Sequence, residues 1–202
     1  MNQKPKILAI PGSLRARSLN RKVLRTAAGG AEKAGAEVTV IDLKDFPMPV
    51  YDPDEHEAGG FDPKALAFQR LVREHDGFLV ASPEYNGSVT GALKNAIDWA
   101  SVGSGEFPRE EVFRDKFAAI MTASPGSFGG VRTLSHLRAI MTSVGVHVLP
   151  TEIAVTFAPE KFEGEEMIDP KTRDILENLG ASLTEIVRAM RIRPENENGA
   201  VR

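Results

Sequence analysis

Short apolar runs alternate along the chain with longer segments whose apolar residues recur at helical spacing. A continuous apolar or β-branched run of four or five residues is typical of a strand that is covered on both faces of a parallel sheet. Such runs predict strands at 7–10, 38–41, 78–81, 117–121 and 146–149, the last with an extension at 153–155 beyond Pro150. The amphipathic segments predict helices at 22–34, 63–74, 92–101, 131–143 and 170–191.

This alternation of strands and helices predicts a three-layer α/β fold, with a parallel sheet of five strands and helices on both faces. We expect the strand order 2-1-3-4-5, one of the two common orders of such sheets. Two polar, proline-containing segments, 42–62 and 102–115, are predicted to be long connections, the first with a mobile tip. No internal repeat or linker divides the chain, so residues 1–193 are predicted to form a single domain and 194–202 a polar C-terminal tail.

The composition argues against several classes of protein and of functional site. The 202 residues carry a net charge of −3, which argues against a nucleic-acid-binding surface. With no cysteine, the chain has no disulfides, thiolate metal sites or cysteine nucleophiles. The four histidines show no ligand spacing, so no metal site is expected. No apolar run approaches the length of a membrane span or a signal sequence, and we expect a cytoplasmic protein.

The segment Gly12–Asn20 combines the features of an anion-binding loop. It connects the first strand to the first helix, so the unpaired N–H groups and the positive dipole end of that helix converge on it. Hydroxyl and amide side chains and two arginines, which hydrogen-bond to phosphate oxygens, lie in the same segment. A plain strand-to-helix turn with Ser18 as N-cap is the simpler alternative, but it does not require Ser13 or Arg15. The segment therefore favours a phosphate site.

Two more loops take the same position in the fold as this one. Residues 83–91 follow the third strand and 124–130 the fourth, and both are rich in Gly, Ser, Pro and Asn. In an open doubly wound sheet, ligands bind outside the carboxyl ends of the strands, near the switch in strand order. The three loops are therefore expected to form three walls of one crevice. The first loop has neither Gly-x-Gly-x-x-Gly nor Gly-Lys-[Ser/Thr], which favours a mononucleotide phosphate over a dinucleotide or a triphosphate.

Three pieces of the sequence, at their mutual spacing, resemble the NADPH-dependent FMN reductase family. They are Gly12-Ser13-Leu14-Arg15 with Ser18 and Asn20, then Pro83-Glu84-Tyr85-Asn86 followed by Leu93 to Trp99, and finally Ser124-Pro125-Gly126 with Gly129-Gly130. The similarity runs from about residue 5 to about residue 150. The resemblance implies a flavodoxin-like fold and FMN as cofactor, in a family that includes flavin, quinone, chromate and azo-compound reductases.

The resemblance also implies which residues hold the cofactor. The phosphate site is expected at Ser13, Arg15, Ser18 and Asn20, with Leu19 contributing its backbone. The isoalloxazine site is expected at Pro83, Glu84, Tyr85 and Asn86, with Ser124 and Gly126 opposite. Thr90 stands where the family usually has proline, and a slightly more flexible loop is expected there.

Some residues near these motifs are given structural roles instead. Glu84 is expected to contribute through its backbone, because hydride transfer from a nicotinamide needs no catalytic base, and no side chain is assigned a catalytic role. Arg17 is expected to point into solvent, and Trp99 to lie in the core or in a subunit interface. Lys94 and Asp98 stand four apart, which predicts a surface ion pair of about 0.3 kcal/mol, or else a place in a subunit interface.

The hypothesis that follows is an FMN-dependent oxidoreductase. It takes a hydride from NADPH or NADH onto bound FMN and passes electrons to a quinone, flavin, chromate or azo compound by a ping-pong mechanism. The alternatives are a flavodoxin-like electron carrier that oxidises no nicotinamide and a flavin-free regulator or binding module that uses the same crevice. The resemblance implies a homodimer or homotetramer, and neither a nucleic-acid partner nor a membrane partner is expected.

Overall fold

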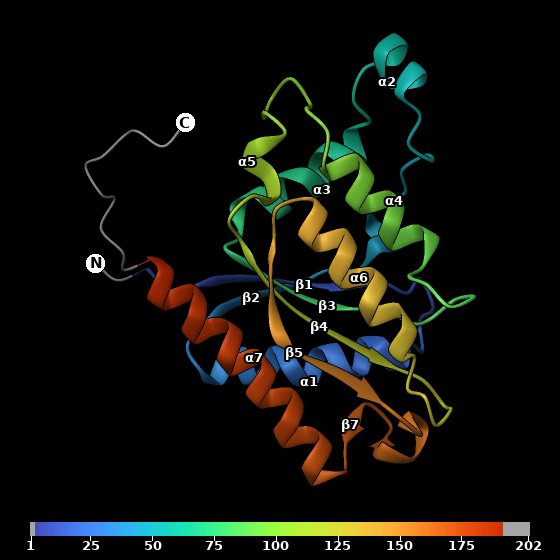
Figure 1. Ribbon diagram of the computed structural model, residues 1–202, viewed down its shortest axis with the longest axis vertical. Helices are drawn as coiled ribbons and strands as arrows, with labels where there is room; N and C mark the ends of the chain where they lie inside the picture. Colours follow the sequence, from blue (N-terminus) through green and yellow to red (C-terminus); the bar gives the residue numbers. More distant parts are fainter. Residues whose placement is uncertain (1–2, 192–202) are drawn as a thin grey trace.

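The computed structural model describes residues 3–191 and confirms the predicted three-layer architecture (Figure 1). A sheet of five parallel strands lies in the middle, in the order β2-β1-β3-β4-β5. The strands are β1 (Lys6–Pro11), β2 (Glu37–Val40), β3 (Gly77–Ala81), β4 (Phe117–Ala123) and β5 (His147–Val155). This is the strand order of flavodoxin-like sheets. The chain adds strands toward one edge from β1 to β2 and toward the other edge from β3 onward, and sheets of this type bind their ligands at that switch point between β1 and β3.

Helices cover both faces of the sheet. On one face lie α1 (Leu19–Lys33) and α7 (Pro170–Arg191), and on the other α3 (Pro63–Glu74), α4 (Gly91–Ala100) and α6 (Val131–Ser143). The helix α1 begins at Leu19, earlier than the predicted residue 22, because the Ser18 side chain caps its first turn. The other four helices begin and end within one residue of the predicted ranges.

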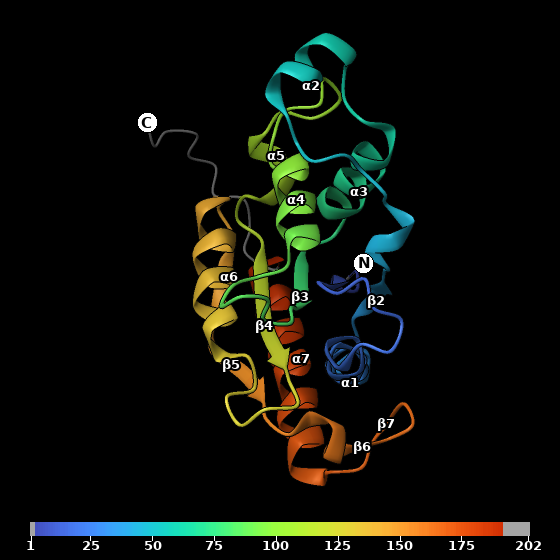
Figure 2. The ribbon, with the colours of Figure 1, turned by 90° about the vertical axis from the view of Figure 1, so that its right-hand side faces the viewer.

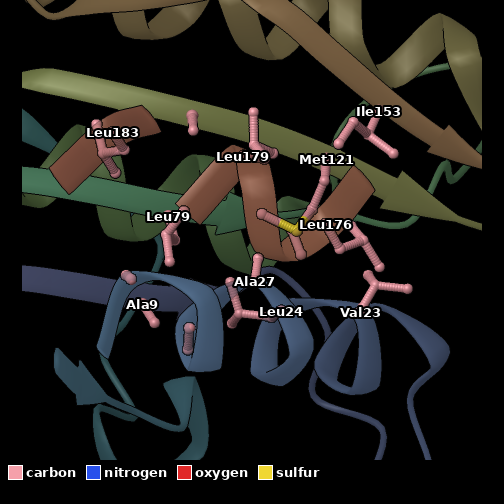
Figure 3. Close-up of a cluster of buried hydrophobic side chains, with 14 of the residues drawn as sticks. Ala9, Val23, Leu24, Ala27, Leu79, Met121, Ile153, Leu176, Leu179 and Leu183 are labelled. Carbon is pink, nitrogen blue, oxygen red and sulfur yellow. The ribbon is translucent and has the colours of Figure 1, made fainter. Parts of the chain in front are cut away.

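The alternation of side chains along each strand divides the core into two clusters. Ile7 and Ala9 of β1 point toward α1 and α7, while Leu8 and Ile10 point toward α3, α4 and α6. Figure 3 shows the first cluster, in which Ala27 of α1 lies close to α7 and both helices cover the sheet. Because both faces of the inner strands are covered, those strands carry continuous apolar sequence rather than alternating sequence.

The helices α1 and α7 touch through their backbones. A Cβ atom added to Gly30 would lie 2.1 Å from the carbonyl oxygen of Glu177, and one added to Gly180 would lie 1.9 Å from that of Ala27. Real Cβ atoms do not approach other atoms so closely, so the crossing requires glycine at both positions. These two glycines set the distance between the N-terminal and C-terminal helices of the fold.

Two strands differ from their prediction. The predicted strand 38–41 was expected to be covered on both faces, but β2 lies at the edge of the sheet and Val40 is largely exposed. The strand β5 is continuous from His147 to Val155, across Pro150. Its pairing with β4 shifts between Ala118 and Ile120, and such an irregularity accommodates a residue that has no N–H to donate.

The long connections contain short helices that the apolar pattern did not predict. Segment 42–62 includes a 3-10 turn, η1 (Leu43–Asp45), and the helix α2 (Pro53–Gly59), which projects from the end of the molecule near α3 and α4 (Figure 2). Segment 102–115 includes α5 (Glu110–Phe113). The helix α2 buries none of its own residues, and the side chain of Asp52 caps it by accepting from Asp54 N–H.

Trp99 lies in the core, as predicted, and it holds the 42–62 segment on α4. It is buried, its indole N–H donates to the carbonyl of Pro49 at 2.8 Å, and its ring contacts Tyr51 and Phe61 edge-on. The predicted ion pair between Lys94 and Asp98 also forms, at 2.8 Å on the exposed side of α4.

After β5 the chain forms a small substructure that the sequence analysis did not predict. It comprises the turn η2 (Ala158–Lys161) and the hairpin of β6 (Phe162–Glu163) and β7 (Glu166–Met167), which lies next to α1. The predicted tail, 194–202, lies outside the described residues. Across residues 3–191, no helix combines the length and the apolar character that crossing a membrane requires.

Candidate functional site

The loops that follow β1, β3 and β4 surround one hollow of about 190 Å³ at the carboxyl edge of the sheet. In Figure 1 this is the edge where the strand arrows end. Except for Asn86 and Gly126, all the residues that were expected to hold a cofactor line this hollow. The three loops therefore form walls of one crevice, as the strand order predicted.

Arg17 lies on this wall as well, and it is exposed, as expected from the sequence. Residues 16 and 17 form a turn directly before Ser18, the N-cap of α1. None of the ion pairs within residues 3–191 involves Arg15 or Arg17, whereas the neighbouring Arg21 is paired with Asp42 at 2.7 Å. Both guanidinium groups on the wall are thus available to an anion.

The first turn of α1 presents further donors. The Ser18 hydroxyl accepts from the N–H of Arg21 at 3.3 Å and caps the helix, so the simpler role considered for Ser18 is real. Among the residues that the structure describes, none accepts from the N–H of Leu19 or Asn20. These two N–H groups lie at the positive end of the helix dipole, where an anion is favoured.

The side chain of Asn20 has a structural partner. Its Nδ2 donates to the carbonyl of Ala123 at 2.8 Å, and its Oδ1 accepts from the N–H of Ala123 at 2.9 Å. The residue is buried, so this pair fixes the start of α1 against the end of β4. The amide is therefore engaged within the protein, while its second Nδ2 hydrogen and the backbone N–H of Asn20 have no acceptor among the described residues.

The second loop is a tight two-residue hairpin. Tyr85 and Ser88 exchange backbone hydrogen bonds of 2.9 and 3.1 Å. Asn86 and Gly87 between them have φ angles of +52° and +81°, as in a type I′ turn, which Asn-Gly forms most readily. Asn86 thus shapes the turn and does not line the hollow, while Tyr85 on the wall is half exposed.

Glu84 uses its side chain as well as its backbone. The carboxylate accepts from the backbone N–H of Arg132 at 3.0 Å and from its Nε at 2.7 Å, at the start of α6. The hydrogen bonds from Arg132 hold the pKa of the Glu84 carboxyl below its usual range. The sequence predicted only a backbone role for Glu84, and the contact of its side chain with Arg132 was not predicted.

The third loop is folded on itself. The Ser124 hydroxyl accepts from the N–H of Gly126 at 3.2 Å, and the carbonyl of Gly126 accepts from Gly129 N–H at 3.3 Å. Ser124 lines the hollow and Gly126 does not, and the carbonyl of Gly126 also accepts from the N–H of Phe157 at 3.3 Å.

Thr90 fixes the second loop where more flexibility was expected. The residue is buried, and its hydroxyl caps α4 by accepting from the N–H of Leu93 at 3.2 Å. The same hydroxyl donates to the carbonyl of Gly12 in the first loop. A proline has no hydroxyl to make this connection, so the threonine holds the two loops together.

The hollow suits a phosphate monoester at its first-loop side. Its groups there are two unpaired guanidinium side chains, two backbone N–H groups of a helix N-terminus and the buried hydroxyls of Ser13 and Ser18. All of these can donate hydrogen bonds to phosphate oxygens. Residues 3–191 contain no cluster of three acidic, histidine or cysteine side chains that could ligate a metal ion.

Comparisons with known proteins agree with this geometry. A model of the family described as NADPH-dependent FMN reductase matches residues 5–160. An NAD(P)H-dependent FMN reductase of Pseudomonas aeruginosa is 37% identical over 193 residues, which are 95% of this chain and 100% of the relative. A probable NADPH:quinone oxidoreductase 1 of Oryza sativa subsp. japonica is 39% identical over 184 residues, which are 88% of this chain and 89% of the relative.

A solved structure of a flavoenzyme has the same fold. The flavoenzyme NAD(P)H:(acceptor) oxidoreductase FerB from Paracoccus denitrificans superimposes with a TM-score of 0.78 at 26% identity, over 92% of this chain and 98% of that one. The family match covers β1 to β5 and all three loops of the hollow. The chain thus belongs to the NADPH-dependent FMN reductase family, whose cofactor is FMN.

Proposed function

We propose that the chain binds FMN in the hollow and works as an NAD(P)H-dependent oxidoreductase. The observation that carries this proposal is the set of unpaired donors on the first-loop wall, which faces the loop of Pro83, Glu84 and Tyr85 across the hollow. The phosphate of FMN would bind to Ser13, Arg15 and the N–H groups of Leu19 and Asn20, and the isoalloxazine would lie along the second loop, opposite Ser124.

The size of the hollow supports this orientation. At about 190 Å³ it is smaller than the roughly 300 Å³ at which pockets begin to enclose a whole drug-sized ligand. It therefore suits the phosphate and the chain attached to it, while the ring would extend over the half-exposed Tyr85 and remain open to other molecules. An open ring is what a nicotinamide needs in order to reach it.

When bound, FMN supplies the redox chemistry: a two-electron acceptor for the nicotinamide hydride and a donor to the second substrate. The protein anchors the phosphate, orients the ring and leaves one face accessible. With a single open face, the nicotinamide and the acceptor would bind in turn, which gives ping-pong kinetics. Quinone is the acceptor we favour, because the relative from Oryza sativa is named for it. Free flavin, chromate and azo compounds remain further candidates.

We further propose that residues 1–193 form one FMN-binding domain and that the protein acts in the cytoplasm as a homodimer or homotetramer. Light scattering of the purified protein measures the assembly directly. A monomer at micromolar concentration would contradict that part of the proposal.

The first experiment is an absorbance spectrum followed by an oxidation assay. The protein should show flavin bands after purification or after addition of FMN, and it should oxidise NADPH or NADH continuously in the presence of a quinone. Initial rates at several fixed quinone concentrations should give parallel double-reciprocal lines. A flavin spectrum without nicotinamide oxidation would indicate an electron carrier, and a protein that binds no flavin would indicate a regulator or binding module.

A further inference from the structure

The helix α6 cannot cap its own first turn. Its N-cap residue, Gly130, has a φ angle of +90°, and a Cβ atom there would lie 2.6 Å from Oγ1 of Thr122. Both facts require glycine at this position, so the usual Ser, Thr, Asp or Asn side chain is absent. The N–H groups of Val131 and Thr133 donate locally, to the carbonyls of Phe128 and Gly130, so it is the N–H of Arg132 that needs an acceptor from elsewhere in the chain.

Glu84 provides that acceptor from the second loop of the hollow. The carboxylate accepts from the N–H of Arg132, the second residue of α6, and it is ion-paired with the Arg132 guanidinium. The Glu84 side chain is only 11% exposed, whereas that of Arg132 is 73% exposed. The buried partner of this pair is thus the carboxylate, which lies at the positive end of the helix dipole.

A second contact joins the same loop to the next turn of α6. The Ser88 hydroxyl and Nδ1 of His136 are 2.8 Å apart. Residues 85–88 between the two contacts form the tight turn described above, which leaves little freedom in the connecting backbone. The loop is therefore held on α6 at both of its ends.

We propose that Glu84 is a positioning residue for the flavin ring: by capping α6, its side chain holds Pro83 and Tyr85 at the place where the ring binds. This inference rests on the proposed FMN site. Loss of the carboxylate would leave the loop attached to α6 only through Ser88 and His136, so its Pro83–Tyr85 end would be released and the ring would lose an ordered surface to bind. The phosphate side of the hollow, formed by the first loop, would be unaffected.

Riboflavin has the flavin ring but no phosphate, so comparing its binding with that of FMN tests the ring side of the hollow separately from the phosphate side. The full chain, stripped of flavin, is titrated with FMN and with riboflavin, and binding is followed by flavin fluorescence. Glu84→Ala should weaken the binding of both flavins by the same factor, about tenfold. Glu84→Gln keeps an acceptor oxygen for the N–H of Arg132 and should stay within about threefold of the unsubstituted protein.

Asp62→Ala is the matched control. Asp62 also caps a helix with its carboxylate, accepting from Lys64 N–H at 2.8 Å at the start of α3, but it does not line the hollow. Both alanine variants should lower the melting temperature by about 2–4 °C, as the loss of one cap predicts. Only Glu84→Ala should change the affinity for flavin.

The possible results distinguish a failure of the positioning role from a failure of the proposed function. Unchanged affinity of Glu84→Ala for riboflavin, or a loss confined to FMN, would overturn the positioning role. If the unsubstituted protein binds neither flavin, the proposed function itself fails. If Glu84→Ala does not fold, Glu84→Asp replaces it, because it keeps the charge but withdraws the carboxylate from α6. It should then weaken both flavins equally, and unchanged affinities would again refute the proposal.

Discussion

Arg15 and Glu84 are both charged residues of the hollow, but they differ in whether their charge is paired within the protein. Glu84 is engaged by Arg132 and by the backbone of α6, so its charge is already satisfied within the protein. No ion pair within residues 3–191 involves Arg15, which therefore keeps its donors for a ligand. At the residue scale, the partners of a side chain decide whether it binds a cofactor or supports the residues that do.

This difference gives a prediction for Arg15. Arg15→Ala should weaken FMN binding about tenfold to a hundredfold, since a hydrogen bond to a charged group contributes about 1.5–3 kcal/mol. Riboflavin binding should be unchanged, because riboflavin has no phosphate for the guanidinium to hold. Fluorescence titration of both flavins measures the two affinities.

Arg109→Ala is the control for this experiment. It removes the same charge from an exposed position that lies on a different hollow, next to α5, and it should leave the affinities for both flavins unchanged. Equal affinities of the Arg15→Ala protein and the unsubstituted protein for FMN would contradict the phosphate site.

At the scale of elements, the strongest constraint is the crossing of α1 and α7. Two adjacent glycines of α1 have opposite surroundings: a Cβ on Gly29 would meet nothing within 4 Å, whereas a Cβ on Gly30 would collide with the backbone of α7. The amphipathic pattern predicts both helices, but it does not say that their backbones touch.

The two glycines predict opposite effects on stability. Gly29→Ala should raise the free energy of unfolding by about 0.5–1 kcal/mol, because alanine restricts the unfolded chain and favours the helix. Gly30→Ala should lower it by about 3 kcal/mol or more, since backbone atoms of α7 cannot yield as a flexible side chain would. Urea unfolding of both variants measures the difference, and two changes of the same sign would refute the backbone contact.

The elements that the sequence did not predict share a physical cause. The helix α2 buries none of its residues, so it has no amphipathic pattern, and its stability comes from its Asp52 cap and from the contact of its segment with Trp99. The predicted strand order already puts β2 at the edge of the sheet, but its partial exposure was missed for a related reason. Its apolar run is as continuous as those of the inner strands, and only the assembled sheet shows how far its residues are exposed.

At the scale of the whole molecule, His75 links the end of α3 to the edge strand β2. Its Nδ1 donates to the carbonyl of Leu71 at 2.6 Å, so in the neutral ring Nε2 accepts from the hydroxyl of Thr39, at 2.9 Å. Burial lowers the pKa of His75 below its ordinary value of 6.5, and the charge of the nearby Lys116 acts in the same direction. The folded protein therefore holds this histidine neutral.

The stability of the protein should depend on pH through this group. Because the pKa of His75 is lower in the folded protein than in the unfolded chain, the unfolded chain binds more protons at this group below about pH 6.5, so the free energy of unfolding should fall from pH 7 to pH 5.5. The pKa values of the Asp42, Glu84, Glu106 and Asp169 carboxyl groups are lowered by their partners, so these four groups titrate below this range. Urea midpoints at several pH values should decrease in the unsubstituted protein and change less in His75→Gln. An equal slope in both would contradict the role of His75.

The sequence alone determined the fold class and the three loops of the hollow, because these depend on apolar periodicity and on turn-forming residues that are local in the chain, whereas the strand order was expected from the resemblance to flavodoxin-like proteins. It also identified most of the wall of the hollow, since the loops lie at fixed places after their strands. Partners far apart in the chain were decided only by the tertiary structure: Asn20 with Ala123, Glu84 with Arg132, and Gly30 with α7. Each of these pairs needs two segments brought together by the packing of the whole sheet, and no local pattern specifies which groups then meet.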